Sequence, residues 1–363
     1  MIPMAIRGIG PVGAFGAGLD EWRAALKGEK KVEPELTTIE TDQGSYNLPV
    51  FRAATKTLGT IVKSRELRRL DHFSRLALLG ACLACEDAGQ TLISEHTGLI
   101  VASVYGASAT TFAFLDSFIK DGDTLASPTL FSNSVHNAAA AHIAKHLNIT
   151  GPNLSLTQGN LSIPMALMTA AHWLAEGRVD AVLCGAVDEY CDVLGYCWQN
   201  YLNRQKPTTR ENLDPDLTPC GPGEGSLFFW LSRAEGPNTP YGYLEKFEQN
   251  TLEPTNKTLN GAGPLIYSPG ACHDNLNLRL NQLNNYLHLD LSQLCGTLPI
   301  ATAFDLATAA TMLCDQALYT NEPLKHPSIP FSGSAICCWQ PDYATSRKPL
   351  TGNCYWITNR LNL

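Results

Sequence analysis

The sequence is poor in charged residues. They make up 17% of its 363 residues, and their balance leaves a net charge of −8. Soluble domains usually carry about a quarter of charged residues, so we expect much of this chain to face an interior or an interface. Domains that bind nucleic acid are normally strongly basic. The composition therefore argues against a nucleic-acid partner.

Long hydrophobic runs are also missing. No apolar stretch reaches the roughly 20 residues that a membrane-spanning helix needs. The start, MIPMAIRGIGPVGAFG, has no basic segment followed by an unbroken apolar stretch, so it does not resemble a signal peptide. We expect a cytoplasmic protein without a membrane span.

The twelve cysteines do not form a recognisable framework. Without an export signal, reduced and mostly buried thiols are the expectation. Cys82 and Cys85 form a CxxC, but they lie in the helical pattern RLALLGACLACEDAG with no second cysteine pair nearby. We therefore predict that both pack in the core. We also expect no metal and no directly bound cofactor.

Strand patterns alternate with helical patterns along the chain. Apolar runs typical of buried strands cover 5–9, 98–104, 154–156, 180–187 and 223–233. Helical spacing of apolar residues covers 19–26, 64–89, 110–119, 134–147, 163–176 and 301–318. Irregular stretches at 204–222 and about 250–275 separate these elements. The alternation favours an α/β fold with helices on both sides of a sheet.

Four stretches, in this order, resemble the β-ketoacyl synthase family of the thiolase fold. They are RGIGPVGAFGAGLDEWRAALKGE, ASPTLFSNSVHNAAAAHIAKHLNITGPNLSL, GRVDAVLCGAVDEY and CGPGEGSLFFWL, and the resemblance extends to about residue 320. It implies a thiolase-like fold of two related βαβ halves in a layered α/β/α/β/α arrangement, which we place at 1–240 and 241–363. It also implies a dimer with a continuous sheet and a large interface.

The stretch LSLTQGNLSIPMALMTAAHWL, residues 154–174, has the pattern of a strand, a polar elbow and a helix. In active members of the family, the elbow holds a cysteine whose thiol pKa is lowered by the helix N-terminus. The resemblance puts Asn160 at that position. An asparagine amide is no useful nucleophile, but it is a good N-cap. We therefore predict that Asn160 caps the following helix.

The other catalytic positions that the resemblance implies are also changed. One histidine position corresponds to Pro269, and LPIATA places Leu298 and Ala303 at a lysine and a second histidine position. Decarboxylative condensation needs a thiolate and imidazoles. The resemblance therefore implies a catalytically inactive chain, most similar to a chain length factor that pairs with an active ketosynthase. Among such factors, the compact length and the LRRLDHFSRLALLGACLACEDAG stretch favour an aryl polyene pathway.

Such a chain would shape its partner's acyl tunnel. The residues that we assign to this tunnel and its interface are Phe112, Phe114, Phe118, Phe131, His136 and Gln158. Ordinary core packing is the alternative for the phenylalanines of the 110–119 helix. The acyl chain would arrive on the phosphopantetheine arm of an acyl carrier protein, which is acidic. A basic cluster of Lys63, Arg65, Arg68 and Arg69 would contact this carrier, unless it is only a solvated helix face.

Several alternatives remain open. Cys184 or Cys272 could serve as the nucleophile of an acyltransferase, and a homodimeric scaffold could bind carrier proteins without catalysis. Some family members decarboxylate malonyl groups with a glutamine at the nucleophile position, but Gln158 lies two residues away from it. His142 and His146 share one helix face without an evident third metal ligand, which favours packing or hydrogen bonding. For His273 and Asp274, ordinary loop polarity is favoured over a base with its orienting group.

Overall fold

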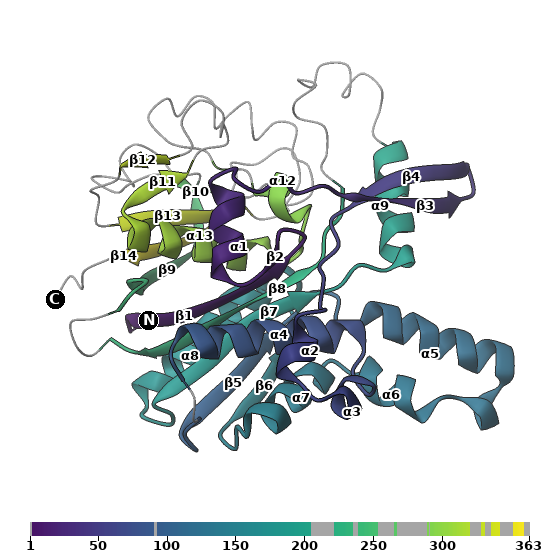
Figure 1. Ribbon diagram of the computed structural model, residues 1–363, viewed down its shortest axis with the longest axis horizontal. Coiled ribbons are helices and arrows are strands. Elements are labelled where there is room, and N and C mark those ends of the chain that lie inside the picture. The colour runs from purple at the N-terminus through teal and green to yellow at the C-terminus, as the bar shows by residue number, and fades with distance from the viewer. Residues whose placement is uncertain are drawn as a thin grey trace.

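The computed structural model is drawn as ribbons in Figure 1. It describes residues 2–90, 93–204, 221–234, 239–252, 265–266, 289, 291–319, 328–330, 335–341 and 351–358. The predicted loop at 204–222 and the irregular stretch at about 250–275 lie mostly outside these residues. Within the described residues, no helix has the length and apolar character needed to cross a membrane.

A mixed ten-stranded sheet joins the two halves of the chain. Its strands are β1 (Met4–Gly13), β2 (Gly16–Ala17), β5 (Thr97–Ala102), β6 (Asn153–Leu156), β7 (Ala181–Asp188), β8 (Gly225–Arg233), β9 (Tyr243–Leu252), β10 (Leu265–Ile266), β13 (Ala335–Pro341) and β14 (Thr351–Thr358). The order is β10-β13-β14-β9-β1-β8-β7-β5-β6, with β2 paired to β1. β9 pairs with β14 along most of its length but with β1 over only two residues. This short contact divides the sheet into a first half-sheet of β1, β2 and β5–β8 and a second half-sheet of β9, β10, β13 and β14.

Two short ladders lie outside this sheet. β3 (Glu35–Thr41) and β4 (Gly44–Val50) form an antiparallel hairpin, and β11 (Ala317–Tyr319) pairs with β12 (Ser328–Pro330). Figure 1 shows the hairpin beside α9, away from the main sheet.

Helices cover both faces of the first half-sheet. The helices are α1 (Leu19–Leu26), α2 (Leu58–Ile61), α3 (Ser64–Leu67), α4 (His72–Asp87), α5 (Ser108–Asp121), α6 (Pro128–Ser134), α7 (Ala138–Leu147), α8 (Ser162–Ala175), α9 (Asp192–Arg204), α12 (Ser292–Cys295) and α13 (Ala301–Asp315). α4 packs across β1 and β8 with α7 beside it, while α8 packs against β5 and β7. α13 contacts β13 and β14 and also reaches β1 and β8.

The core consists mainly of two apolar clusters, one on each face of the first half-sheet. One cluster contains α8, α13 and residues of both half-sheets, and the other contains α4 and α7. The predicted α/β fold with helices on both sides is therefore confirmed. In the described part of the chain, four of the five predicted layers are present: α4 with α7, the first half-sheet, α8 with α13, and the second half-sheet.

Helix α4 approaches the sheet closely because glycines meet at the contact. A Cβ atom on Gly10 would lie 2.0 Å from the carbonyl oxygen of Gly80, so neither position has room for a side chain. The helical region predicted over 64–89 is present as two helices, α3 and α4. The carboxylate of Asp71 accepts a hydrogen bond from the Ser74 N–H at 3.1 Å, which caps α4 and separates it from α3.

The described cysteines are free, and most are buried. Cys82 and Cys85 lie within α4, and burial raises the pKa of each thiol to about 12. Thiols with such a pKa stay protonated and unreactive at neutral pH. The prediction that this CxxC serves core packing is confirmed.

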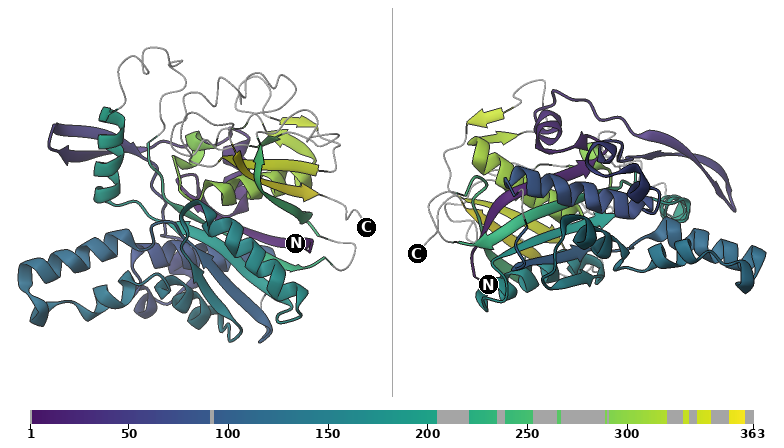
Figure 2. Two further views of the ribbon diagram at one scale, coloured as in Figure 1. Left: turned by 180° about the vertical axis from the view of Figure 1, so that it is seen from behind. Right: turned by 60° about the horizontal axis from the view of Figure 1, so that its bottom comes forward.

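Helices α5 and α6 form an arm, residues 108–134, that extends beyond the sheet (Figures 1 and 2). The rings of Phe114 and Phe131 hold its two helices together, with ring centroids 5.5 Å apart. Much of its apolar surface faces solvent, since Phe112, Leu115, Phe118, Ile119 and Leu125 are exposed and Phe131 is only partly covered by Phe114. Exposed apolar surface of this extent is typical of a protein-interaction site.

Candidate functional site: a pocket above the elbow

The predicted elbow connects β6 to α8 through a short 3-10 turn at Gly159–Leu161, which contains Asn160. The prediction that Asn160 caps α8 is wrong. The N-cap of α8 is Leu161, which makes no side-chain cap bond. The buried hydroxyl of Ser162 instead accepts from the Gln158 N–H at 2.8 Å and lies 2.9 Å from the Ser103 carbonyl oxygen. The elbow is therefore tied to the end of β5 by a serine.

A pocket of about 370 Å³ lies above this elbow. Its lining residues are Val104, Tyr105, Asn160, Glu189, Tyr190, Leu194, Cys197, Trp198, Tyr201, Pro222, Gly223, Thr297, Leu298 and Pro299. Asn160 and Leu298 are far apart in the sequence, and the fold brings these two predicted positions together. Ala303 is buried in α13 and packs near Ile163 under α8, outside this lining. Pro269 lies outside the described residues.

The lining lacks the groups that condensation needs. No histidine is among the described lining residues, and the sulfur there belongs to Cys197 on α9. Cys184 is fully buried within β7, away from this pocket, and burial raises the pKa of its thiol to about 12. It is therefore a poor candidate for the alternative nucleophile. Cys272, His273 and Asp274 lie outside the described residues.

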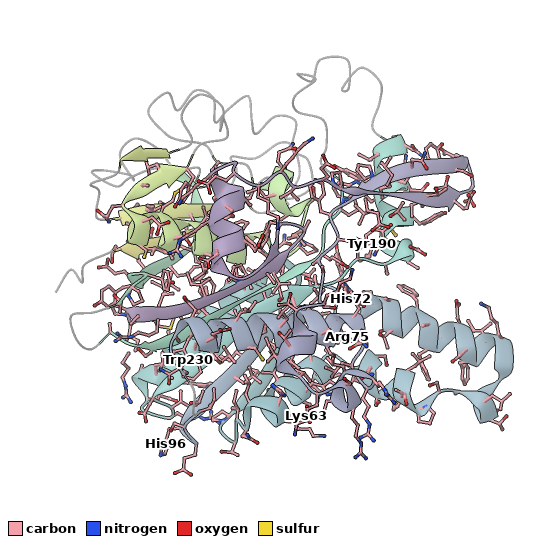
Figure 3. All side chains as sticks on the ribbon, viewed as in Figure 1. Lys63, His72, Arg75, His96, Tyr190 and Trp230 are labelled. Carbon is pink, nitrogen blue, oxygen red and sulfur yellow. The ribbon has the colours of Figure 1, made fainter. Side chains whose placement is uncertain are left out.

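Glu224, next to the lining residue Gly223, connects three segments of the chain. One of its carboxylate oxygens accepts from the Ala53 N–H at 3.0 Å and lies 2.9 Å from Nε2 of His72. The other oxygen accepts from the Tyr190 N–H at 3.0 Å; His72 and Tyr190 are labelled in Figure 3. Burial disfavours a charged His72, but the hydrogen bond and charge of Glu224 outweigh it, so the pKa of His72 is raised.

Asp188 fixes the loop between β5 and α5. Its carboxylate accepts from the Ser103 hydroxyl at 2.7 Å, the Val104 N–H at 3.0 Å and the Tyr105 N–H at 2.9 Å. The side chain is 1% exposed. Burial raises the pKa of Asp188 to about 6, although these hydrogen bonds oppose the shift. Asp188 thus positions Val104 and Tyr105, which form one wall of the pocket.

The neighbouring Glu189 supports the start of the arm. Its Oε1 accepts from the Ala109 N–H at 2.8 Å, in the first turn of α5. Its Oε2 is buried and has no hydrogen-bond partner among the described residues. Burial raises the pKa of this carboxyl to about 7. Sequence patterns did not single out this residue, because an acidic side chain after a buried strand usually marks only a surface turn.

None of the residues predicted for the tunnel and interface is part of the lining of this pocket. Phe112 and Phe118 on α5 are 39% and 47% exposed, so core packing within this chain does not account for them. The ring of His136 packs over Gly106, where a Cβ atom would lie 2.3 Å from its Nδ1. Gln158 is exposed on the elbow. Their predicted role toward a partner stays a prediction.

The predicted basic cluster lies around α3, and its four side chains are exposed. Arg65 and Arg69 line a second pocket of about 530 Å³, which Lys145 and His146 of α7 also line. Lys63 and Arg68 are not part of this lining. Sequence reasoning missed Lys145, because it lies far along the chain from α3 and only the packing of α4 against α7 brings it near.

The two histidines of α7 both contact polar partners. Nε2 of His142 lies 3.2 Å from Oδ1 of Asn133, and Nδ1 of His146 lies 3.5 Å from a carboxylate oxygen of Glu66. The predicted packing or hydrogen-bonding role is confirmed for His142, whereas His146 makes an ion-pair contact. Among the residues that the structure describes, no group of three or more histidine, cysteine or acidic side chains could hold a metal ion.

Comparisons with known proteins support the family in two ways. The family model "Beta-ketoacyl synthase, N-terminal domain" matches residues 20–214. A 3-oxoacyl-[acyl-carrier-protein] synthase 2 from Coxiella burnetii is 23% identical over 197 residues, which are 53% of this chain and 47% of that protein. The chain therefore spans about half the length of the curated relatives it matches.

Solved structures match almost the whole chain. A β-ketoacyl synthase from Burkholderia phymatum has a TM-score of 0.72 at 16% identity, covering 99% of this chain and 100% of that one. A ketosynthase in complex with its chain length factor, from Xenorhabdus doucetiae, has a TM-score of 0.70 at 14% identity, covering 98% of each. At this identity the structural likeness establishes the fold, which is thiolase-like. Since the family model covers more than half of its residues, this chain belongs to the β-ketoacyl synthase family.

Proposed function

We propose that this chain is a non-catalytic subunit of a ketosynthase complex, with the role of a chain length factor. The observation that carries the proposal is the pocket lining, which includes Asn160 of the elbow and Leu298. An amide and an aliphatic side chain offer neither a thiolate nor an imidazole. The bonds of the condensation would then be made in the active site of a separate ketosynthase subunit.

Two features support pairing with such a subunit. β6 is an edge strand, bonded to β5 on one side and to no strand on the other among the described residues. The arm presents exposed apolar side chains, including Phe112 and Phe118. An open strand edge and an apolar surface are both features that a partner chain can cover.

Co-expression with the ketosynthase encoded next to this chain tests the proposal. We expect the two to co-purify as a heterodimer. After incubation with an acylated carrier protein, intact-mass analysis should find acyl groups on the partner and none on this chain. Acyl transfer to this chain alone would instead support the acyltransferase alternative. A stable homodimer that excludes the co-expressed ketosynthase would support the carrier-binding scaffold.

A finer proposal concerns chain length. Phe112, Phe114 and Phe118 on α5 would close the far end of the partner's acyl tunnel, in a complex that extends an aryl polyene. Each methylene of the acyl chain that is buried in the tunnel contributes about 0.8 kcal/mol to binding. A wall at the end of the tunnel prevents further methylenes from being buried, so a longer chain is not stabilised. We expect Phe112→Ala and Phe114→Ala to lengthen the products of the reconstituted pair, as read by mass spectrometry. An unchanged length distribution for both variants would contradict this assignment.

The basic cluster would help to bind the carrier protein that delivers the phosphopantetheine-linked acyl chain in the cytoplasm. Arg65 and Arg69 share a pocket with Lys145, which concentrates positive charge between α3 and α7. We expect Arg65→Glu with Arg69→Glu to weaken carrier binding at least tenfold, through lost electrostatic steering. Arg178→Glu, near the C-terminal end of α8, is the matched control. Equal effects in the two variants would contradict a specific site.

A further inference from the structure

The pocket above the elbow contains a carboxyl group with an unused oxygen. Glu189 lines this pocket and is 2% exposed. Its Oε1 is engaged by the Ala109 N–H, whereas Oε2 is buried without a partner among the described residues. Buried polar atoms in native proteins are nearly always hydrogen-bonded. An unpaired oxygen beside a cavity therefore marks a position where a ligand can supply the missing bond.

The walls of the pocket suit an aromatic ligand. They include the rings of Tyr105, Tyr190, Trp198 and Tyr201 together with the apolar side chains of Val104, Leu194 and Leu298. Nε1 of Trp198 is also buried without a partner among the described residues. A volume of about 370 Å³ lies within the range of small-molecule sites, which are mostly apolar with a few polar groups.

The charges around Glu189 select among ligand types. Asp71 and Glu224 raise its pKa and His72 lowers it, and burial is the largest influence, bringing the pKa to about 7. The two neighbouring carboxylates repel an anionic ligand. The Arg52 guanidinium lies 4.7 Å from the centre of the Tyr190 ring, and its positive charge disfavours a cation beside that ring. The other titratable side chains of the lining are the phenols of Tyr105, Tyr190 and Tyr201 and the thiol of Cys197, and none of these is a basic or carboxylic group. A neutral ligand remains.

We propose that this pocket binds a neutral aromatic carbonyl compound, whose ring lies between the aromatic walls and whose carbonyl oxygen accepts a hydrogen bond from the Glu189 carboxyl group. The inference goes beyond the proposed function, because it concerns binding by this chain's own pocket. It does not depend on any partner subunit. It requires the protonated form of Glu189, since a carboxylate has no proton to donate.

Calorimetric titration of the full-length chain with benzamide tests the inference. With a pKa of about 7, raising the pH from 6 to 8 removes most of the protonated form and should weaken binding about tenfold. Glu189→Gln keeps a neutral N–H donor, so it should bind benzamide with no such pH dependence. Glu189→Met should bind at least tenfold more weakly than the wild type at pH 6. Glu176→Gln, on the surface at the end of α8, is the control.

Three results would overturn the inference. They are no benzamide binding at either pH, the same pH dependence in Glu189→Gln as in the wild type, and tighter binding of benzylammonium than of benzamide. Thermal unfolding of each variant accompanies the titrations. If Glu189→Met does not fold, the comparison of the wild type with Glu189→Gln across pH still decides the question.

Discussion

At the scale of single residues, buried carboxylates organise the pocket. Asp188 holds the loop at Val104 and Tyr105, Glu189 supports the first turn of α5, and Glu224 joins Ala53, His72 and Tyr190. The hydrogen bonds that these oxygens accept offset part of the cost of burying each carboxyl group. Removing one of these side chains should therefore both alter the pocket and lower the free energy of unfolding.

Asp188→Asn should destabilise the chain. An amide offers one acceptor oxygen in place of two and places N–H donors near the N–H groups of the loop, so we expect a loss of about 2 kcal/mol in the free energy of unfolding. Urea unfolding measures the change. Asp180→Asn is the control, because Asp180 is exposed and its ion pair with Arg233 lies at the surface. We expect that substitution to cost under about 1 kcal/mol. Equal losses of unfolding free energy in the two variants would show that the buried hydrogen bonds of Asp188 contribute no more to stability than a surface ion pair.

The residues of the site were only partly predictable. Asn160 and Leu298 were found because the resemblance assigned them positions by order along the chain. Glu189 and Lys145 were missed, since their roles depend on which side chains pack near them. The cap was wrongly assigned to Asn160 because a 3-10 turn intervenes before α8, and sequence patterns do not distinguish such a turn from a first helical turn.

At the scale of elements, the contact between β1 and α4 determines how closely the outer helical layer approaches the sheet. A Cβ atom on Gly80 would lie 2.6 Å from Oγ of Ser226 and 3.1 Å from the carbonyl oxygen of Gly10. Because the opposing atoms include backbone, the helix cannot relieve the clash by a simple side-chain rotation. Glycine at positions 10 and 80 therefore allows α4 to pack closely against β1.

Gly80→Ala should consequently lower stability, although alanine is the better helix former by about 1 kcal/mol. Overpacking of a core contact usually costs about 1–3 kcal/mol, so we expect a net loss in thermal or chemical unfolding. Gly59→Ala is the matched control, because a Cβ atom there meets nothing within 4 Å. A Gly80→Ala variant as stable as Gly59→Ala would mean that α4 shifts freely on the sheet.

The arm is the other element with a testable role. Ile119 and Leu125 are 77% and 71% exposed, so aspartate at either position should leave the unfolding of the free chain nearly unchanged. In the proposed heterodimer these positions would be covered, and a buried unpaired charge should weaken association at least tenfold. Light scattering of the co-purified pair measures this. Leu36→Asp, equally exposed on β3, is the control, and equal weakening by all three substitutions would contradict a role of the arm.

At the scale of the whole molecule, one sheet contains strands from both halves of the chain and so joins the two halves. α13 from the second half packs against β1 and β8 of the first, and Arg23 of α1 pairs with Asp315 of α13 at 3.1 Å. The layered α/β arrangement could be predicted from the alternation of strand and helix patterns. The course of the arm and the position of α9 beside the β3–β4 hairpin could not be predicted. Polar and apolar residues mix on these elements, because they lie outside the core.

The open edge of β6 has a consequence for how the chain must be produced. Among the described residues, no strand pairs with the outer edge of β6, so its four residues offer a template on which an extended peptide can dock, including one from another molecule of the same kind. Chains whose edge stays uncovered should aggregate or be degraded. If the proposed ketosynthase subunit covers this edge, the yield of folded chain should be highest when the two proteins are produced in equal amounts.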